Sequence, residues 1–152
     1  MVKILEISKL DEVMKIWLEE NIEAHSFVSE QYWIDNFAVV RELLPQAEIL
    51  VYEDKDGMKG FIGITEKTYI AGLFVSNRYQ SNGIGSILIE KCKHLYPLLR
   101  LNVYAKNAKA ISFYRKHGFE IEQENVNDDT NEKEYSMIWK SLAYILASAT
   151  IR

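Results

Sequence analysis

A glycine-containing junction between a strand and a helix is the feature that most restricts how this chain can fold. Residues 69–75 form the apolar run of a buried strand, and residues 83–95 show the apolar periodicity of a helix. Between them stands the sequence Gln80-Ser81-Asn82-Gly83-Ile84-Gly85-Ser86. Glycines at the start of a helix let an anion approach its free backbone amides. The junction therefore indicates a fold of helices and strands with an anion site, although a plain tight turn would have the same pattern.

Charge along the chain also indicates a local anion site. Residues 76–118 contain eight basic residues and one acid, whereas the whole chain has a net charge of −4. A basic segment in an acidic protein favours a small polyanionic ligand over general binding to nucleic acid, although solvated helix faces would give the same pattern. Two nucleotide-binding motifs are excluded at the junction. The Gly-Lys-Ser/Thr ending of a P-loop is missing, and so are the third glycine and the downstream acid of the dinucleotide fingerprint.

Length and composition predict one domain over residues 1–152. The chain has 152 residues, of which 48% are apolar, and no linker or repeat divides it. The single cysteine, Cys92, excludes a disulfide framework, and the spacing of cysteine and histidine predicts no metal site. We expect Cys92 to be a buried, inert thiol. No apolar run is long enough to span a membrane, and the charged N-terminus lacks the pattern of a signal peptide, so a cytoplasmic location is expected.

Hydrophobic periodicity predicts about four helices and about seven strands. The helices are expected at residues 10–23, 29–44, 83–95 and 108–117, and the strands at residues 2–6, 47–53, 59–65, 69–75, 98–103, 119–126 and 134–140. This order predicts an α/β (α+β) fold, with a mixed but mostly antiparallel central sheet and one crossover through the helix at 83–95. Residues 141–152 carry no turn or partner signal, so the sequence leaves open whether they form an additional helical end or are foreign to the domain.

A second motif follows the strand at residues 98–103. Its sequence is Asn107-Ala108-Lys109-Ala110-Ile111-Ser112-Phe113-Tyr114-Arg115-Lys116-His117-Gly118-Phe119. Together the two motifs resemble the cofactor-binding half of the GNAT N-acetyltransferase superfamily, whose patterns are Gln/Arg-x-x-Gly-x-Gly/Ala and Asn-x-x-Ala-x-x-Phe-Tyr-x-x-x-Gly-Phe. The resemblance extends over about residues 47–140, and the expected strand order agrees with it. The N-terminal helices and the Asp128-Asp129 turn are similar, more loosely, to the bacterial YjaB-type acetyltransferases.

The resemblance implies a GNAT-like fold and transfer of an acetyl group from acetyl-CoA, as co-substrate, to a primary amine. The amides of residues 81–86 would hold the pyrophosphate, and the backbone of residues 73–75 would pair with the pantetheine arm. The Val75 amide would polarise the thioester carbonyl, and Asn107 would contact the pantetheine or order its loop. Basic side chains near the 3′-phosphate would come from Arg78, Lys109, Arg115 or Lys116. The cofactor-binding residues implied are Leu73, Phe74, Val75, Gln80, Ser81, Asn82, Gly83, Ile84, Gly85, Ser86, Asn107 and Tyr114.

Tyr114 is the expected catalytic acid. Attack of an amine on the thioester expels a thiolate, and a positioned phenol can donate a proton or a hydrogen bond to it. The simpler alternative is an aromatic residue on the apolar face of a helix, a role that Phe113 fits better. Because the sequence shows no nucleophile beside a base, direct transfer in a ternary complex is expected.

The general base stays open at this stage. Many GNAT members place a glutamate on the strand before the glycine loop, but residues 69–75 contain no acid. The candidates are Glu66, His25, Glu30, a water chain or an amine that arrives neutral, and loop packing is the simpler interpretation of His25. The missing acid motivates the main alternative, a non-catalytic acyl-CoA-binding or sensing domain on the same fold. A third interpretation is an interaction module whose glycine loop is only a turn.

The acceptor side is the least defined part of the sequence. Aromatic residues at helical spacing often pack in cores, but they can also line a substrate pocket. The acidic segment at residues 120–134 would attract a cationic acceptor or simply form a solvated face. The acceptor is expected to be a small-molecule or peptide amine, with neither nucleic acid nor membrane as a partner, and the resemblance is compatible with a homodimer. The residues expected at the acceptor pocket are His25, Phe27, Tyr32 and Tyr104, with Trp33 beside them.

Overall fold

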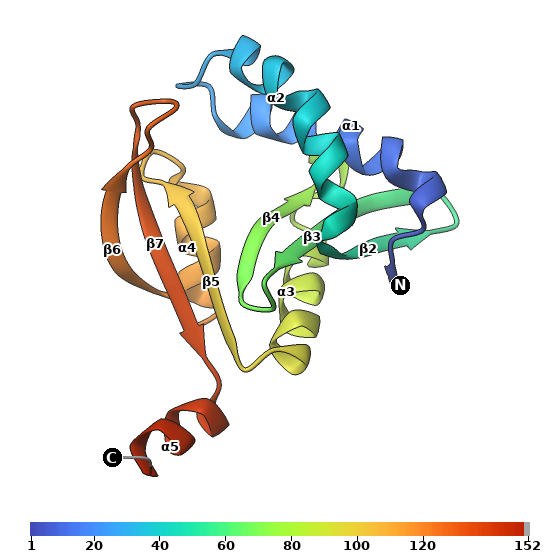
Figure 1. Cartoon of the computed structure of the whole chain (residues 1–152). Coiled ribbons are helices and arrows are strands. Elements are labelled where there is room, and N and C mark those ends of the chain that lie inside the picture. The colour runs from blue at the N-terminus through green and yellow to red at the C-terminus, as the bar shows by residue number, and fades with distance from the viewer. Residues whose placement is uncertain (151–152) are drawn as a thin grey trace.

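A mixed sheet of seven strands lies at the centre of the computed structural model, which describes residues 1–150 (Figure 1). The strands are β1 Val2–Ile4, β2 Glu48–Asp54, β3 Gly57–Thr65, β4 Tyr69–Val75, β5 Leu98–Tyr104, β6 Glu120–Val126 and β7 Lys133–Lys140. Their order across the sheet is β1-β2-β3-β4-β5-β7-β6, and neighbours are antiparallel except β4 and β5, which run parallel. The predicted mixed, mostly antiparallel sheet with one crossover is confirmed.

Within residues 1–150, four helices flank the sheet and a fifth extends away from it (Figure 1). Local chemistry sets several of their ends. The Ser29 hydroxyl accepts a hydrogen bond from the Gln31 amide (3.2 Å) where the second helix begins, and Gly118 takes a left-handed φ of 87° after the fourth. The helices are α1 Leu10–Ala24, α2 Glu30–Leu43, α3 Ile84–Leu95, α4 Ala108–Lys116 and α5 Leu142–Thr150, with 3₁₀ turns at Ile7–Lys9, Leu44–Gln46 and Asn77–Tyr79.

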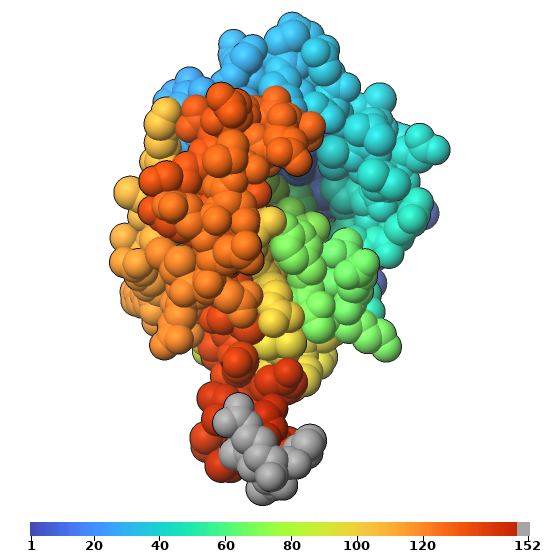
Figure 2. Space-filling model, turned by 60° about the vertical axis from the view of Figure 1, so that its left-hand side comes forward, coloured from blue at the N-terminus to red at the C-terminus, as the bar shows by residue number. Residues whose placement is uncertain are grey.

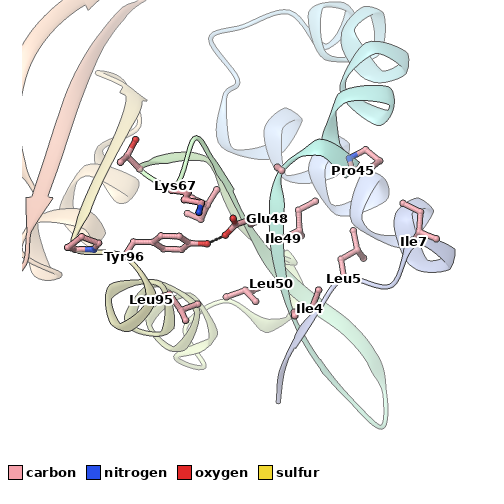
Figure 3. A pocket seen from close by; sticks show the side chains of 14 residues that line it. Ile4, Leu5, Ile7, Pro45, Glu48, Ile49, Leu50, Lys67, Leu95 and Tyr96 are labelled. Atoms are coloured by element: carbon pink, nitrogen blue, oxygen red, sulfur yellow. Dashed lines mark hydrogen bonds between the residues drawn. The ribbon is translucent and has the colours of Figure 1, made fainter.

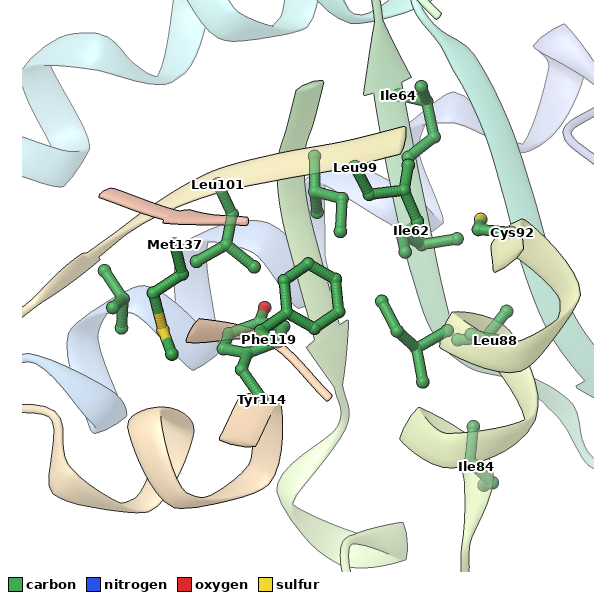
Figure 4. Packing of buried hydrophobic residues seen from close by; sticks show 13 residues of the cluster. Ile62, Ile64, Ile84, Leu88, Cys92, Leu99, Leu101, Tyr114, Phe119 and Met137 are labelled. Atoms are coloured by element: carbon green, nitrogen blue, oxygen red, sulfur yellow. The ribbon is translucent and has the colours of Figure 1, made fainter. Parts of the chain in front are cut away.

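The two faces of the sheet carry separate hydrophobic clusters, because successive strand residues point to opposite faces. On β3, Phe61 packs in one cluster with Val13 of α1, whereas Ile62 packs in the other with Leu88 of α3. Helix α1, with α2 against it, therefore covers one face, and α3 and α4 cover the other. Figure 4 shows the second cluster, in which Tyr114 of α4 joins side chains of α3 and of the central strands.

Strands β4 and β5 separate after a single point of contact. Within residues 1–150 they pair only where Tyr69 lies opposite Arg100, and the Arg100 amide donates to the Thr68 carbonyl (2.7 Å). Beyond this point the two parallel strands diverge toward their carboxyl ends, and Figure 1 shows the gap between them. The β4 backbone groups that face this gap therefore have no neighbouring strand to pair with.

The tail, which the sequence left open, forms helix α5 over Leu142–Thr150. This helix follows Ser141, whose amide donates to the Pro97 carbonyl (2.8 Å), and it extends away from the sheet (Figure 1). Its Leu142, Ile145 and Leu146 side chains are exposed. Residues 151–152 lie outside the described residues. None of the helices in residues 1–150 is long and apolar enough to cross a membrane.

Candidate cofactor-binding and active site

A cleft of about 840 Å³ opens at the carboxyl end of β4, beside the gap between β4 and β5. Its walls come from the end of α1, the end of β4 with the loop that follows, the first turn of α3, and α4. The fold thus brings together segments that lie far apart in the sequence. Asn82 is outside the lining, and the predicted cofactor residues that line the cleft are Leu73, Phe74, Val75, Gln80, Ser81, Gly83, Ile84, Gly85, Ser86, Asn107 and Tyr114.

The first turn of α3 offers free backbone donors to this cleft. Gly83 precedes the helix with a left-handed φ of 80°, and no side chain of the described residues caps this end. By contrast, the Ser29 and Asn107 side chains accept hydrogen bonds from the first turns of α2 and α4. The amides of Ile84 and Gly85 therefore stay available, in the partial positive field of the helix N-terminus. This arrangement suits a bound anion.

The edge of β4 that faces the gap offers a second set of backbone groups. The Ser76 amide donates to the Lys59 carbonyl (2.8 Å) on β3. Because successive residues of a strand direct their backbone groups to opposite sides, those of Val75 and Leu73 face away from β3. The Val75 carbonyl accepts a hydrogen bond from the Gln80 side chain (2.9 Å), which leaves the Val75 amide to donate to a ligand. An extended ligand arm can add to such an edge as another strand would.

Only part of the basic segment contributes to the cleft. Arg100, for example, pairs with Glu122 (3.3 Å), so its charge is compensated by a neighbouring strand. Of the residues expected near a 3′-phosphate, two lysines line the cleft and the two arginines do not. The positive charge at the cleft therefore comes from one side of α4 and the loop before it. The lining lysines are Lys106, Lys109 and Lys116, and the arginines outside the lining are Arg78 and Arg115.

Tyr114 lies on α4 at the boundary between the core and the cleft. It is 9% exposed, and its ring packs against those of Phe113 and Phe119 at centroid distances of 5.4 and 5.5 Å (Figure 4). Burial raises the pKa of the Tyr114 phenol above its ordinary value, with a further contribution from Tyr69. The phenol therefore stays protonated at neutral pH, which is the form that can donate a proton or a hydrogen bond.

His25 is buried at the end of α1 and meets the cleft beside Asn107. Asn107 Oδ1 accepts a hydrogen bond from the Ala110 amide (3.2 Å), so we assign Nδ2 as the donor to His25 Nε2 (3.2 Å). The ring hydrogen of His25 is then on Nδ1, which has no hydrogen-bond partner in the described residues. Burial lowers the pKa of His25 to about 4, and the Asn21 backbone opposes that shift in part. His25 is therefore neutral at pH 7 and a weak base.

The stability of the protein should depend on His25 below neutral pH. Its pKa is about 4 when folded and 6.5 when exposed, so unfolding takes up a proton between these values and stability falls as the pH falls. We expect this residue to lower the free energy of unfolding by about 2 kcal/mol between pH 7 and pH 5. The His25→Gln variant should lack this part of the pH dependence. Urea denaturation of both proteins at the two pH values measures it, and the same slope in both would contradict the assignment.

The aromatic residues expected around an acceptor gather on the other side of His25. They connect the loop between α1 and α2 to the turn between β6 and β7, where the Tyr32 hydroxyl donates to Asp129 Oδ2 (3.4 Å). None of them lines the cleft itself. Figure 2 shows the surface hollowed between the β6–β7 hairpin and α2. The rings around His25, at centroid distances of 5.7, 5.4 and 5.0 Å, are those of Phe27, Trp33 and Tyr104.

Glu20 is a buried carboxylate that the sequence analysis did not single out. It is 6% exposed on α1 and lines the cleft. Its Oε2 accepts a hydrogen bond from the Asn77 amide (2.9 Å), and its Oε1 accepts one from Gln80 Nε2 (2.9 Å). Burial raises the pKa of Glu20, and the bond from Asn77 opposes that shift. The sequence could have indicated this role, because residue 20 continues the periodic buried face of α1. An acid on a buried face requires partners.

Ser86 stands beside a histidine, which the sequence did not reveal. Ser86 Oγ lies 2.9 Å from His117 Nε2, and His117 Nδ1 lies 3.3 Å from Glu90 Oε2. The expectation that no nucleophile adjoins a base is therefore wrong for these three side chains. They lie at the first turns of α3 and the end of α4, beside the free amides that suit an anion. In the acetyl-CoA position that the resemblance implies, the amides of residues 81–86 would hold the pyrophosphate, so Ser86 would meet that group rather than the thioester.

The remaining candidates lie away from the cleft. Glu66 is in the turn between β3 and β4, at the opposite end of β4 from Val75, and Glu30 is exposed at the start of α2. The predicted burial of Cys92 is confirmed, and burial raises the pKa of its thiol to about 12, so little thiolate forms at neutral pH. Among residues 1–150, no group of three or more His, Cys, Asp or Glu side chains could hold a metal ion.

A second cavity, of about 860 Å³, lies between β2 and the end of α3 (Figure 3). Its walls are mostly apolar, with side chains such as Ile4, Leu50 and Leu95. The Tyr96 hydroxyl donates to Glu48 across it (Figure 3). None of the predicted site residues lines this cavity, so the cleft at the start of α3 is the candidate site.

The divergent strand pair, the glycine turn and the helix that carries Tyr114 meet at this one cleft. The family model described as "Acetyltransferase (GNAT) domain" matches residues 19–133. The chain belongs to this family, which is a family of acyltransferase enzymes, and the predicted resemblance is confirmed.

Known proteins agree with this assignment along most of the chain. The Escherichia coli peptidyl-lysine N-acetyltransferase YiaC is 33% identical over 140 residues, which is 91% of this chain and 96% of YiaC. The Escherichia coli peptidyl-lysine N-acetyltransferase YjaB is 29% identical over 136 residues, 89% of this chain and 90% of YjaB. The solution structure of apo-YjaB superposes with a TM-score of 0.80 at 24% identity, over 93% of this chain and 97% of that one. An aminoglycoside 6′-N-acetyltransferase solved with coenzyme A has a TM-score of 0.69 at 14% identity, over 92% of this chain and 96% of that one.

Proposed function

We propose that this protein transfers an acetyl group from acetyl-CoA directly to a primary amine, as one cytoplasmic domain over residues 1–152. The observation that carries the proposal is the convergence of three features on one cleft: the uncapped start of α3, the free edge of β4, and Tyr114. Two relatives are named as peptidyl-lysine N-acetyltransferases, which supports a peptide lysine as the acceptor. The carboxylate of Asp129, beside the aromatic residues, would attract such a cation.

Binding in this proposal uses mainly backbone groups. Acetyl-CoA supplies the acetyl group as a thioester. The amides of residues 81–86 hold the pyrophosphate, and Lys109 and Lys116, which line the cleft, stand close to the 3′-phosphate. Leu73 and Val75 pair with the pantetheine arm along the free edge of β4.

The chemical step uses Val75 and Tyr114. The Val75 amide donates to the thioester carbonyl as negative charge builds on its oxygen. The new C–N bond forms as the C–S bond breaks, and the Tyr114 phenol gives its proton to the departing sulfur. The proton lost by the amine passes through water and restores the phenol, because buried His25, with a pKa of about 4, is a poor acceptor for it.

Titration of coenzyme A and of acetyl-CoA into the purified protein tests the binding step. We expect a dissociation constant in the micromolar range for both, because the cleft offers several charge-assisted hydrogen bonds to the phosphates. Isothermal calorimetry measures it. No heat of binding at millimolar ligand would overturn the proposal. Where binding is found, mass spectrometry of lysine peptides incubated with acetyl-CoA shows whether their mass rises by about 42 Da, the net gain when an acetyl group replaces a hydrogen.

A non-catalytic acyl-CoA sensor is the second candidate function. Strand β4 carries no acid, and His25 is buried with a pKa of about 4, so neither supplies a strong base at the β4–β5 gap. Binding of coenzyme A without acetylation of any amine in a broad panel would favour this candidate over the enzyme.

A further inference from the structure

We propose that Glu20 is a positioning residue that holds the phosphate-binding turn in its binding conformation before the cofactor arrives. This inference rests on the proposed binding of acetyl-CoA at the start of α3. The starting observation is a buried carboxylate on the wall of a cleft that three lysines also line. A negative charge there weakens anion binding unless its own contacts compensate, so the carboxylate needs a structural reason.

Both oxygens of Glu20 are bound to the loop between β4 and α3. Oε2 accepts from the Asn77 amide, 57 residues further along the chain, and Oε1 accepts from Gln80 Nε2, 60 residues along (both 2.9 Å). The Asn77 amide begins the 3₁₀ turn Asn77–Tyr79, where a carboxylate is favourable for the free donors. Helix α1 therefore fixes the loop at two points just before Gly83.

Gln80 connects Glu20 to both walls of the cleft through its own hydrogen bonds. Its Nε2 also donates to the Val75 carbonyl (2.9 Å), and its Oε1 accepts from Lys109 Nζ (2.8 Å). One side-chain amide thus holds the end of β4 and directs a lysine of α4. The charge of Lys109 also acts on Glu20 and opposes the rise in its pKa that burial causes, so the two charges partly compensate each other.

A loop that is already in its bound conformation costs less ordering on binding. Without the carboxylate, the Asn77 amide and the Gln80 side chain form hydrogen bonds with water instead. The binding conformation of the loop is then only one of several that it adopts. We expect Glu20→Ala to raise the dissociation constant of coenzyme A about 10- to 100-fold. The KM for acetyl-CoA should rise in parallel, while kcat at saturating acetyl-CoA falls less. A role in general stability would instead lower the active fraction and leave KM unchanged.

The experiment compares Glu20→Ala, Gln80→Ala and the double variant by calorimetry with coenzyme A, with thermal melting as the check of folding. Because Glu20 and Gln80 hold the same loop through a shared hydrogen bond, the double variant should bind no more weakly than the weaker of the two single variants. The matched control is Glu19→Gln, which removes a negative charge from an exposed neighbour on the same helix. It should leave the dissociation constant within about twofold of the wild-type value.

Two results would overturn the inference: wild-type affinity in folded Glu20→Ala, or losses in the two single variants that multiply in the double variant. If Glu20→Ala does not fold, Glu20→Gln replaces it under the same criteria. Glutamine keeps the size of the side chain but places an amide group opposite the Gln80 amide, where the carboxylate accepts a hydrogen bond. If the wild-type protein itself binds no coenzyme A, the proposed function fails, and this inference with it. Wild-type binding that Glu20→Ala retains would refute only the role of Glu20.

Discussion

Replacing Gly83 by aspartate is expected to weaken coenzyme A binding by more than about 100-fold while the protein stays folded. Gly83 precedes α3 with a left-handed φ of 80°, and a Cβ added there meets nothing within 4 Å. Aspartate tolerates this conformation better than most residues and is a favourable helix N-cap. Its carboxylate would accept hydrogen bonds from the free amides of α3, and its charge would repel the pyrophosphate. Several charge-assisted hydrogen bonds would be lost, each contributing about 1.5–3 kcal/mol.

The matched control is Gly83→Asn, which has almost the same shape and no charge. Asparagine is equally compatible with a left-handed φ, so it reports the effect of side-chain bulk alone. We expect it to keep the dissociation constant within about tenfold of wild type. Calorimetry with coenzyme A and thermal melting of all three proteins make the comparison. Aspartate and asparagine variants of equal affinity would show that the phosphates lie elsewhere.

Replacing Tyr114 by phenylalanine is expected to lower kcat about 100-fold and to leave the dissociation constant of coenzyme A nearly unchanged. The change removes one hydroxyl and keeps the ring contacts with Phe113 and Phe119, so the core should be preserved. The buried phenol has a raised pKa and remains protonated at neutral pH. Its loss therefore removes the donor to the departing thiolate without adding or removing a charge.

Tyr79→Phe is the control for this substitution, because Tyr79 also lines the cleft but lies on the loop before α3. It should retain kcat within about threefold. Steady-state rates at saturating acetyl-CoA and calorimetry with coenzyme A separate chemistry from binding in both variants. Turnover of Tyr114→Phe within twofold of wild type would remove Tyr114 from the chemical step. Since the raised pKa keeps the phenol protonated, wild type and variant should have pH–rate profiles of the same shape below about pH 9.

The order and type of the elements could be predicted because they depend on local patterns. Apolar alternation located β5 and β7, and the cap at Ser29 and the glycine at position 118 located helix ends. The tail could not be interpreted in this way. In helix α5, Leu142, Ile145 and Leu146 are exposed, so its apolar residues do not mark a face that packs on the sheet.

The cofactor side of the site could be predicted for the same reason. The glycine turn and the segment from Asn107 to Tyr114 are continuous motifs whose backbone geometry depends on neighbours in the sequence. The acceptor side could not, because the side chains around His25 come from the loop after α1, from α2 and from β5. The hydrogen bond between Ser86 and His117 was missed because it joins the first turn of α3 to the residue that ends α4.

The sequence alone determined where the strands and helices lie, that a glycine turn opens α3, and that Tyr114 follows Asn107 on one helix. These features depend on backbone torsions, capping and periodicity, which act over a few residues. Only the tertiary structure decided that β4 and β5 diverge, that Glu20 is buried against Gln80, and that His25 is held neutral beside Asn107. Burial, shifted pKa values and hydrogen bonds across 60 or 82 residues arise when distant segments exclude water from each other, and no local pattern encodes that.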